Sequence, residues 1–253
     1  MTPSSKTASL QGRWTGVDLD RLPRHLAVIM DGNRRWALRQ LLPGIQGHRA
    51  GVGTMRELVK ACCELGIPHL TVYAFSTENW KRSQDEVGYL WALFQEVIEH
   101  EVEELDAQGV RMRFIGEVDE LAPRIQSVIA QAESRTAGNS RLTLNIALNY
   151  GGRREILEVT RAVARAAMAG QLDVESLDEA SLARFFYTAG QPDPDLLVRT
   201  SGEMRLSNYL LWQLAYTEIH VTDTLWPDFR HEDLRQALVA FQRRDRRFGA
   251  QTR

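Results

Sequence analysis

Charged and amide side chains directly follow an apolar segment at residues 25–30, which has the composition of a buried strand. Residues 30–36 read MDGNRRW. Gly32 and Asn33 permit a tight turn, and the free N–H groups at the start of the helix that follows would face an anion. Asp31 beside a bound phosphate would suit Mg²⁺, which prefers one or two carboxylates together with phosphate oxygens. Asp31 could instead only cap that helix, and the local pattern leaves both interpretations open.

Two further polar clusters have the same position relative to an apolar segment. Residues 75–82 (FSTENWKR) carry small hydroxyls, an amide, an aromatic ring and two bases, although a polar loop with a Ser or Asn cap would give the same pattern. Residues 198–208 (VRTSGEMRLSN) carry two arginines, which bind phosphate oxygens bidentately. Ser207 could also cap a helix over residues 207–215. Because ligands bind at the carboxyl edge of parallel sheets, we expect the three clusters to meet there.

Short apolar runs alternate with helical patterns along the chain, which is typical of a parallel sheet built from βα units. We expect strands at residues 25–30, 69–75, 111–116, 142–151, 195–200 and 218–223. We expect helices at residues 47–65, 84–107, 119–136, 153–169, 178–188, 207–215 and 231–247. The sequence therefore predicts a single α/β domain over residues 21–253, with a mostly parallel central sheet flanked by helices. Residues 1–20 are expected to form a flexible tail.

Composition excludes several classes of protein. The chain has 253 residues with 31 Lys+Arg against 33 Asp+Glu, a net charge of −2, which does not indicate nucleic-acid binding. The two cysteines, Cys62 and Cys63, are adjacent, which excludes a disulfide scaffold and a zinc site. No run approaches the roughly 20 apolar residues of a membrane span, so we expect a cytoplasmic protein. The sequence also lacks the P-loop, GxGxxG and GxSxG motifs. Two phosphate-type sites beside strongly apolar helices therefore suggest amphiphilic phosphates.

Five motifs in order resemble those of the cis-prenyltransferases, the family of the undecaprenyl diphosphate synthases. They are HLAVIMDGNRRWA, GHRAG, LTVYAFSTENWKR, LTLNIALNYGGRREI and DPDLLVRTSGEMRLSNYLLWQLAYTEI followed by LWPDF. The resemblance extends from His25 to Gly249. It implies condensation of farnesyl diphosphate with successive isopentenyl diphosphates, with Mg²⁺ as cofactor. The implied product is a long Z-polyprenyl diphosphate, such as the undecaprenyl diphosphate from which the lipid carrier of cell-wall synthesis is made.

The resemblance also implies roles for particular residues. Asp31 matches the metal–diphosphate aspartate, and Asn79 matches the residue assigned to proton removal. Glu218 matches a second metal-site carboxylate. The other implied substrate-binding residues are Gly32, Asn33, Arg34, Arg35, Trp36, His48, Ser76, Thr77, Glu78, Trp80, Arg82, Arg199, Arg205, Leu206 and Ser207. An amide is a very weak base, so our hypothesis is that Asn79 orients the substrate while the departing diphosphate or Asp31 receives the proton.

The expected reaction needs an apolar interior. The allylic cation needs weakly nucleophilic surroundings, which Phe75, Trp36 and Trp80 could supply. Each CH₂ group of the product that is buried strengthens its binding by about 0.8 kcal/mol. Binding affinity therefore does not stop chain growth, and side chains that block the end of the tunnel must do so. We expect Leu90, Phe94, Ile98 and Leu142 to line an apolar tunnel between the sheet and the helices, although most of them could be ordinary core.

The chain departs from the family pattern at three positions. Gly44 replaces an arginine that helps to bind the allylic diphosphate, and Leu41 stands where glycine is common. Met204 replaces a histidine that binds metal in some members, and Met is a poor ligand for Mg²⁺. The resemblance also implies a homodimer in which the C-terminal Arg247 and Gly249 reach the partner's site. A peripheral membrane contact for product release is a further expectation.

Four alternatives compete with this interpretation. A catalytically weak scaffold subunit is favoured by Gly44 but opposed by the intact Asp31 and Asn79. A phosphoanhydride hydrolase would need no long apolar tunnel. A trans-prenyltransferase normally carries paired DDxxD motifs on an all-α fold, and neither feature is present. A shorter-chain Z-prenyl diphosphate synthase would share every motif, since product length depends on side-chain volumes in the tunnel.

Overall fold

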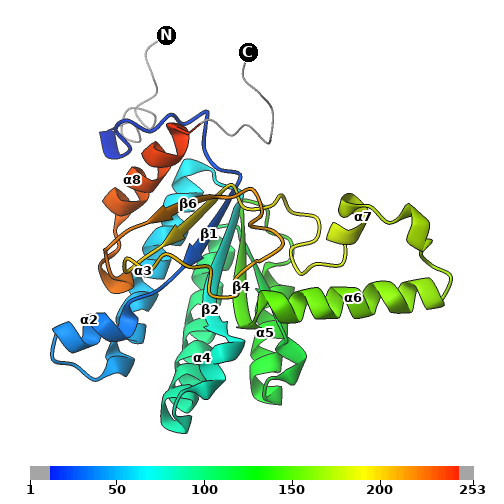
Figure 1. Ribbon diagram of the computed structural model, residues 1–253. Helices are drawn as coiled ribbons and strands as arrows, with labels where there is room; N and C mark the ends of the chain where they lie inside the picture. The colour runs from blue at the N-terminus through cyan, green and yellow to red at the C-terminus, as the bar shows by residue number, and fades with distance from the viewer. Residues whose placement is uncertain (1–11, 245–253) are drawn as a thin grey trace.

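The computed structural model describes residues 12–244 and contains one six-stranded sheet (Figure 1). The strands are β1 (His25–Ile29), β2 (His69–Ser76), β3 (Val110–Ile115), β4 (Leu142–Tyr150), β5 (Leu196–Arg199) and β6 (Glu218–Val221). Their spatial order is β3-β4-β2-β1-β5-β6, and every neighbouring pair is parallel. All six predicted strands are therefore confirmed, and so is the parallel α/β fold.

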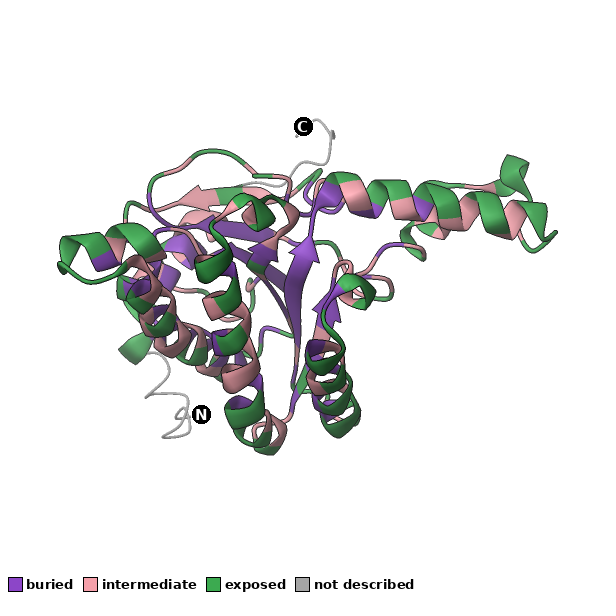
Figure 2. Ribbon diagram, turned by 90° about the horizontal axis from the view of Figure 1, so that it is seen from below, coloured by how far each residue is buried: buried purple, intermediate pink, exposed green. Residues whose placement is uncertain are grey.

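Seven α-helices and four short 3₁₀ turns surround this sheet in the described part of the chain. The helices are α2 (Asn33–Arg39), α3 (Gly44–Leu65), α4 (Gln84–Ala107), α5 (Pro123–Thr136), α6 (Gly152–Met168), α7 (Glu179–Ala183) and α8 (His231–Gln242). The 3₁₀ turns are η1 (Thr77–Lys81), η2 (Val118–Glu120), η3 (Val174–Ser176) and η4 (Trp226–Asp228). Helices α6 and α7 extend away from the sheet, and α2 projects on the other side (Figures 1 and 2).

The sheet has a different cover on each face. Alternate residues of every strand except β6 join α3, α4, α5, α8 and η4 in one large apolar core. The opposite face packs against a smaller cluster that includes Tyr209, Leu210 and Leu214. Figure 2 shows the strands as the most buried part of the molecule. The helical layer therefore lies mainly on one face, and an irregular segment covers much of the other.

The predicted helix at residues 207–215 is wrong. Ser207, Asn208 and Leu210 have φ values of 51°, 61° and 43°, a left-handed conformation that a right-handed helix cannot contain. The segment forms buried turns, so Ser207 does not cap a helix. The predicted helix at 178–188 shortens to Glu179–Ala183 for α7.

The expected tail at residues 1–20 is corrected for residues 12–20, which pack on the domain, whereas residues 1–11 lie outside the described residues. Trp14 is 1% exposed and its ring meets the edge of His231. Gln242 in α8 donates a 2.7 Å hydrogen bond to the backbone oxygen of Asp18. Burying an indole is strongly favourable, which explains why residues 12–20 dock. In residues 12–244, none of the helices has the length and apolar character needed to cross a bilayer.

Candidate active site

The site lies where the order of the strands reverses, between β1 and β5. Ligands of open α/β sheets bind outside the carboxyl ends of the strands at this point. Asp31 follows β1 and Arg199 ends β5, and one guanidinium nitrogen of Arg199 donates to Asp31 Oδ2 at 2.9 Å. The predicted meeting of the first and third clusters is therefore confirmed within one chain.

Arg199 is the central cation of this edge. Its side chain is only 4% exposed, and its second terminal nitrogen donates to Ser207 Oγ at 2.9 Å and to the backbone oxygen of Arg205. Its Nε is buried without a hydrogen-bond partner in the described residues. The guanidinium thus joins Asp31 to the turn at Ser207, with one donor still unused.

Asp31 also faces a second arginine, on α2. Arg35 lies 3.4 Å from Asp31 and 3.3 Å from Glu203, and it donates to the backbone oxygen of Ser201 at 3.1 Å. Partial burial alone would raise the pKa of Asp31. The hydrogen bond and charge of Arg199, with the charge of Arg35, outweigh that effect and lower the pKa. Asp31 is therefore an ionised carboxylate between two cations.

Asp31 is not the cap of α2. The helix starts after Gly32, and no side chain caps it. Gly32 has a φ of 105°, and a Cβ there would lie 2.9 Å from a methyl group of Leu225, so glycine is required at this turn. The capping interpretation of Asp31 is thereby excluded, and its carboxylate faces the edge of the sheet.

The cluster after β2 forms the other side of the site. A bulge in the pairing of β2 with β4 lies between Tyr73 and Ser76, and bulges commonly re-aim side chains near active sites. Asn79 Oδ1 accepts from the backbone N–H of Ser76 at 3.1 Å. Its amide oxygen is therefore engaged, and its NH₂ group is left to donate to a ligand.

Glu78 connects this cluster to the turn after β5. Asn208 donates to Glu78 Oε1 at 2.8 Å, and Thr77 Oγ1 donates to Glu78 Oε2 at 3.3 Å. Burial would raise the pKa of Glu78, but the hydrogen bond from Asn208 and those from nearby groups lower it overall. All three sequence clusters therefore meet at one edge.

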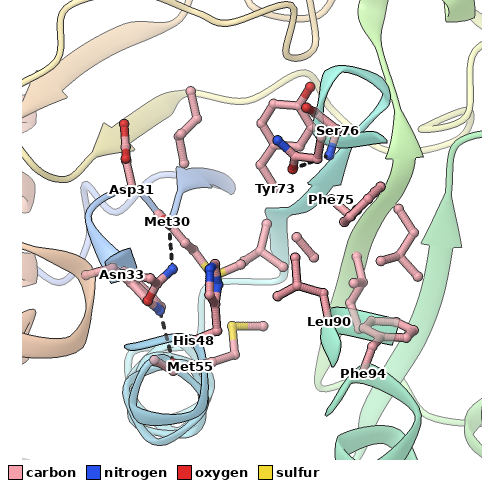
Figure 3. Close-up of a pocket in the computed structure, with 18 of the residues that line it drawn as sticks. Met30, Asp31, Asn33, His48, Met55, Tyr73, Phe75, Ser76, Leu90 and Phe94 are labelled. Carbon is pink, nitrogen blue, oxygen red and sulfur yellow. Dashed lines mark hydrogen bonds between the residues drawn. The ribbon is translucent and has the colours of Figure 1, made fainter. Parts of the chain in front are cut away.

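An apolar cavity of about 680 Å³ opens beneath these polar groups, between the sheet and helices α3 and α4. Figure 3 shows Asp31 and Ser76 toward one end and Met55, Leu90 and Phe94 toward the other. This volume is within the roughly 300–1,000 Å³ of typical ligand pockets. The cavity thus combines an anion-binding mouth with an apolar interior.

His48 lines the cavity from α3 as a neutral imidazole. Burial lowers its pKa to about 4, and the charge of Arg82 acts in the same direction. Arg82 itself lines the mouth and pairs with Glu86 at 3.1 Å.

The cavity includes only part of the predicted tunnel stripe. Leu90 and Phe94 line it, whereas Ile98 and Leu142 do not and belong to the packed core. Leu142 lies on the same face of β4 as the lining residue Ile146, four positions earlier in the strand. A tunnel that reaches Leu142 stays a prediction.

Several predicted substrate-binding residues lie around the mouth and not in the cavity wall. Trp36 donates to Asp228 at 2.8 Å, and Trp80 is 47% exposed and donates to Asn149 at 2.7 Å. The exposed Arg205 pairs with Glu203 at 2.6 Å. The remaining ones outside the wall are Gly32, Arg34, Arg35, Thr77 and the partly buried Leu206. Of the three proposed cation-stabilising rings, only Phe75 lines the cavity.

Glu218 is not part of this site within one chain. In the sheet register it lies beside Leu196, which pairs with Leu26, five residues before Asp31. Its carboxylate instead pairs with Arg244 at 2.5 Å. The described residues contain no cluster of three or more acids, histidines or cysteines that could hold a metal ion. Within one chain the structure does not bring Glu218 to Asp31, because the two residues lie toward opposite ends of parallel strands. The role of Glu218 as a metal-site carboxylate therefore stays a prediction.

The structure adds site residues that the sequence motifs did not single out. Tyr73, in the middle of β2, donates to the backbone oxygens of Tyr150 and Ser207 at 3.2 and 3.3 Å. Asn208 lines the cavity and accepts from the backbone N–H of Arg153 at 2.9 Å. The tolerance of Asn for the left-handed region is a signal that could have indicated Asn208. Tyr73 lies in the middle of a strand, and no comparable signal in the sequence indicates it.

A parallel sheet that carries cationic turns above an apolar cavity is suited to binding amphiphilic phosphates. Residues 29–249 match the family model described as "Putative undecaprenyl diphosphate synthase". The chain belongs to this cis-prenyltransferase family and is an enzyme that transfers prenyl groups.

Relatives and solved structures agree with this membership. The isoprenyl transferase of Heliobacterium mobile is 52% identical over 233 residues, covering 92% of this chain and 90% of the relative. The farnesyl-diphosphate-specific ditrans,polycis-undecaprenyl-diphosphate synthase of Pseudomonas aeruginosa is 46% identical, and the match covers 90% of this chain and 91% of the relative. The crystal structure of lavandulyl diphosphate synthase from Lavandula x intermedia with dimethylallyl diphosphate is similar with a TM-score of 0.87, 36% identity and coverage of 90% and 98%. The crystal structure of a probable undecaprenyl diphosphate synthase from Campylobacter jejuni is similar with a TM-score of 0.74 and 34% identity. The match covers 90% of this chain and 98% of that chain.

Proposed function

We propose that this protein condenses farnesyl diphosphate with successive isopentenyl diphosphates to give undecaprenyl diphosphate, a precursor for cell-wall synthesis. The observation that carries the proposal is the Asp31–Arg199–Ser207 network at the mouth of the apolar cavity. The farnesyl specificity in the name of the 46% identical Pseudomonas aeruginosa relative supports this choice of primer.

The cationic edge binds and orients two diphosphates. Arg199 has an unused buried donor, Nε, and the exposed Arg35 and Arg205 stand beside it. Charge-assisted hydrogen bonds from guanidinium groups to phosphate strengthen as the diphosphate departs and its charge grows. The same groups that bind the substrates would therefore also promote loss of the leaving group.

Mg²⁺ is the proposed cofactor, with Asp31 as the single carboxylate ligand that the described part of one chain would supply at this site. Asp31 offers one ionised carboxylate at the mouth of the cavity, and Mg²⁺ is often held by one or two carboxylates with substrate phosphates and water. When bound there, the ion would neutralise charge on the departing diphosphate. Glu218 does not contribute within one chain, and Met204 is 86% exposed and unsuited to Mg²⁺.

Asn79 is proposed to orient the isopentenyl unit. Because its oxygen already accepts from Ser76 N–H, its NH₂ group would donate to a phosphate oxygen. The proton lost from the isopentenyl carbon would then pass to the departing diphosphate or to Asp31. An Asn79→Ala enzyme with unchanged turnover would exclude this role.

The cavity is proposed to receive the growing chain. The wall includes Val52, Leu90, Phe94 and Ile146, hydrocarbon side chains with no nucleophilic group to capture an allylic cation. Each isoprene unit buried there would gain several times the roughly 0.8 kcal/mol of one CH₂. Growth would end when the chain meets packed side chains, which makes product length a matter of volume.

A homodimer in the cytoplasm is proposed as the working form. Arg247 and Gly249, which are expected to reach the partner's site, lie outside the described residues. The analytical measurement is the mass of the protein in solution by light scattering, where a monomer would contradict the proposal.

The test of the reaction is incubation with farnesyl diphosphate, radiolabelled isopentenyl diphosphate and Mg²⁺, followed by chromatography of the dephosphorylated products. We expect a ladder that ends at the undecaprenyl alcohol. No incorporation of label, with or without detergent, would contradict the proposal.

A shorter product is a second candidate. The solved structure with a TM-score of 0.87 belongs to lavandulyl diphosphate synthase, which is bound to dimethylallyl diphosphate. The same chromatogram separates the two candidates, because a shorter-chain synthase would stop after one or a few additions.

A further inference from the structure

Three leucines are exposed in the last turn of α2 and the segment that joins it to α3. Leu38, Leu41 and Leu42 are 60%, 94% and 41% exposed. We call residues 38–42 the leucine turn. Leu41 has a φ of 58°, and its side chain is directed into solvent. This left-handed φ closes the C-terminus of α2, because the N–H groups of Leu41 and Leu42 donate to the backbone oxygens of Leu38 and Ala37. The exposure of three neighbouring leucines is not explained by folding, which points to a contact outside the chain.

The surroundings of the leucine turn are positively charged. Residues 32–56 contain five arginines and neither aspartate nor glutamate. Arg35, Arg49 and Arg56 pair with acids elsewhere in the fold. Among residues 12–244, the exposed Arg34 and Arg39 have no hydrogen-bond or ion-pair partner, so their charge is available to an external anion.

The leucine turn is also joined at both ends to the wall of the cavity. The chain segment that contains it begins at Asn33 and ends at His48, and both of these residues line the cavity. Figure 1 shows α2 and the turn that follows it projecting from one side of the molecule. A surface that contacts the leucine turn would therefore be close to the site at which the apolar product forms.

We propose that the leucine turn docks on the surface of an anionic lipid bilayer. Such a surface binds exposed apolar side chains that are flanked by unpaired arginines. The apolar side chains enter the boundary of the lipid acyl chains, and the guanidinium groups contact the acidic headgroups. The inference rests on the proposed function in one respect, since a polyprenyl diphosphate is a membrane lipid and the segment that carries the turn is joined at both ends to the cavity wall.

A protein partner is less well supported by the same features. Three leucines on a projecting turn give a small convex contact, whereas stable protein interfaces need about 800 Å² on each side. A bilayer accepts a small apolar tip, and its negative charge complements Arg34 and Arg39.

The direct test is co-sedimentation of the full chain with vesicles of phosphatidylcholine alone and of phosphatidylcholine with phosphatidylglycerol. We expect binding to the anionic vesicles that weakens as salt is raised. The variant Leu38→Gln/Leu41→Gln/Leu42→Gln should bind at least about tenfold more weakly. Arg39→Gln should lower binding to anionic vesicles and leave the residual binding to neutral vesicles unchanged.

Two variants control for folding and for general hydrophobicity. Leu41→Gly should weaken vesicle binding without lowering the thermal midpoint, because glycine adopts the left-handed region freely. Met168→Gln/Val174→Gln changes side chains that are 89% and 57% exposed on the distant α6–η3 region, and it should bind like the unchanged protein.

Full binding by the triple variant, equal loss in the control pair, or no binding by the unchanged protein would each overturn the proposal. A change of oligomeric state in the triple variant would overturn it as well, because the leucines would then cover a second copy. Vesicle binding needs no turnover, so these results are independent of whether the proposed reaction is observed.

Discussion

Arg199 is the residue on which the two phosphate-binding turns depend, because its guanidinium bonds to Asp31 and Ser207 from a buried position. A lysine ammonium keeps the charge but has no planar fork, so it would not hold both partners in the same geometry. The pairing explains why an aspartate after β1 and an arginine after β5 form one site.

Arg199→Lys should lower kcat/KM for isopentenyl diphosphate by about 100-fold, the usual loss when one positioned donor to a developing anion is removed. Initial rates at varied isopentenyl diphosphate measure the change, and circular dichroism checks that the variant is folded. A folded Arg199→Lys protein with unaltered kcat/KM would disprove the role of the guanidinium.

His25 makes stability depend on pH. It is fully buried, with Nδ1 donating to Pro192 O at 2.7 Å and Nε2 accepting from Thr71 Oγ1 at 2.7 Å. Burial lowers its pKa from 6.5 to about 4. Above about pH 6.5 both the folded and unfolded chains hold neutral His25. Between pH 6.5 and 4 the unfolded chain binds a proton that the folded chain does not. The free energy of unfolding therefore decreases as the pH is lowered through this range.

The loss at His25 should reach about 3 kcal/mol at pH 4. Urea unfolding at pH 7.5, 6 and 5 measures it. His25→Gln should show a shallower decrease than the unchanged protein, whereas His100→Gln, at an exposed site on α4, should not. Parallel pH dependence in all three proteins would contradict the assignment.

At the scale of elements, the close approach of α2 to α3 positions Asn33 and Asp31. A Cβ on Gly47 would lie 1.9 Å from the backbone oxygen of Asn33, so only glycine allows this contact. Gly53, later in the same helix, has nothing within 4 Å of the equivalent position. Gly47 and Gly53 of α3 therefore have opposite roles.

Gly47→Ala should destabilise the fold by about 1–3 kcal/mol and lower activity, because α2 must move away from α3. Gly53→Ala should stabilise it by about 0.5–1 kcal/mol and leave activity unchanged. Thermal unfolding and turnover measured on both variants give the comparison. Equal effects would mean that the α2–α3 contact does not position the site.

The strands were predictable from sequence because buried parallel strands read as short runs of Val, Ile and Leu between turn residues. The segment after β5 was not, because NYLLWQLA has a helical pattern of apolar residues. Its left-handed residues Ser207, Asn208 and Leu210 and the hydrogen bonds of Asn208 to Gly152, Arg153 and Glu78 depend on tertiary contacts. The position of Glu218 in the sheet could not be predicted for a related reason, since a motif gives no information about which end of a strand faces the site.

At the scale of the whole molecule, the cavity couples a charged edge to an apolar interior. The meeting of Asp31, Asn79 and Arg199 at one edge followed from parallel topology and could be expected from the sequence. The depth of the cavity could not, because it depends on how α3 and α4 pack over β2 and β4.

Phe94→Ala should shift the products toward longer chains, since it removes a ring from the apolar wall of the cavity. Reversed-phase chromatography of the dephosphorylated products measures chain length. Phe114→Ala is the matched comparison, because Phe114 packs edge-on against Phe94 but does not line the cavity. A product distribution that is the same in Phe94→Ala and the unchanged enzyme would show that this wall does not limit growth.

The most direct test is a crystal structure with Mg²⁺ and an unreactive thio analogue of farnesyl diphosphate. The diphosphate should lie between Asp31 and the arginines of the edge, with the farnesyl chain passing His48 toward Leu90 and Phe94. A farnesyl chain bound outside the space between the sheet and helices α3 and α4, or a diphosphate far from Asp31, would contradict the account.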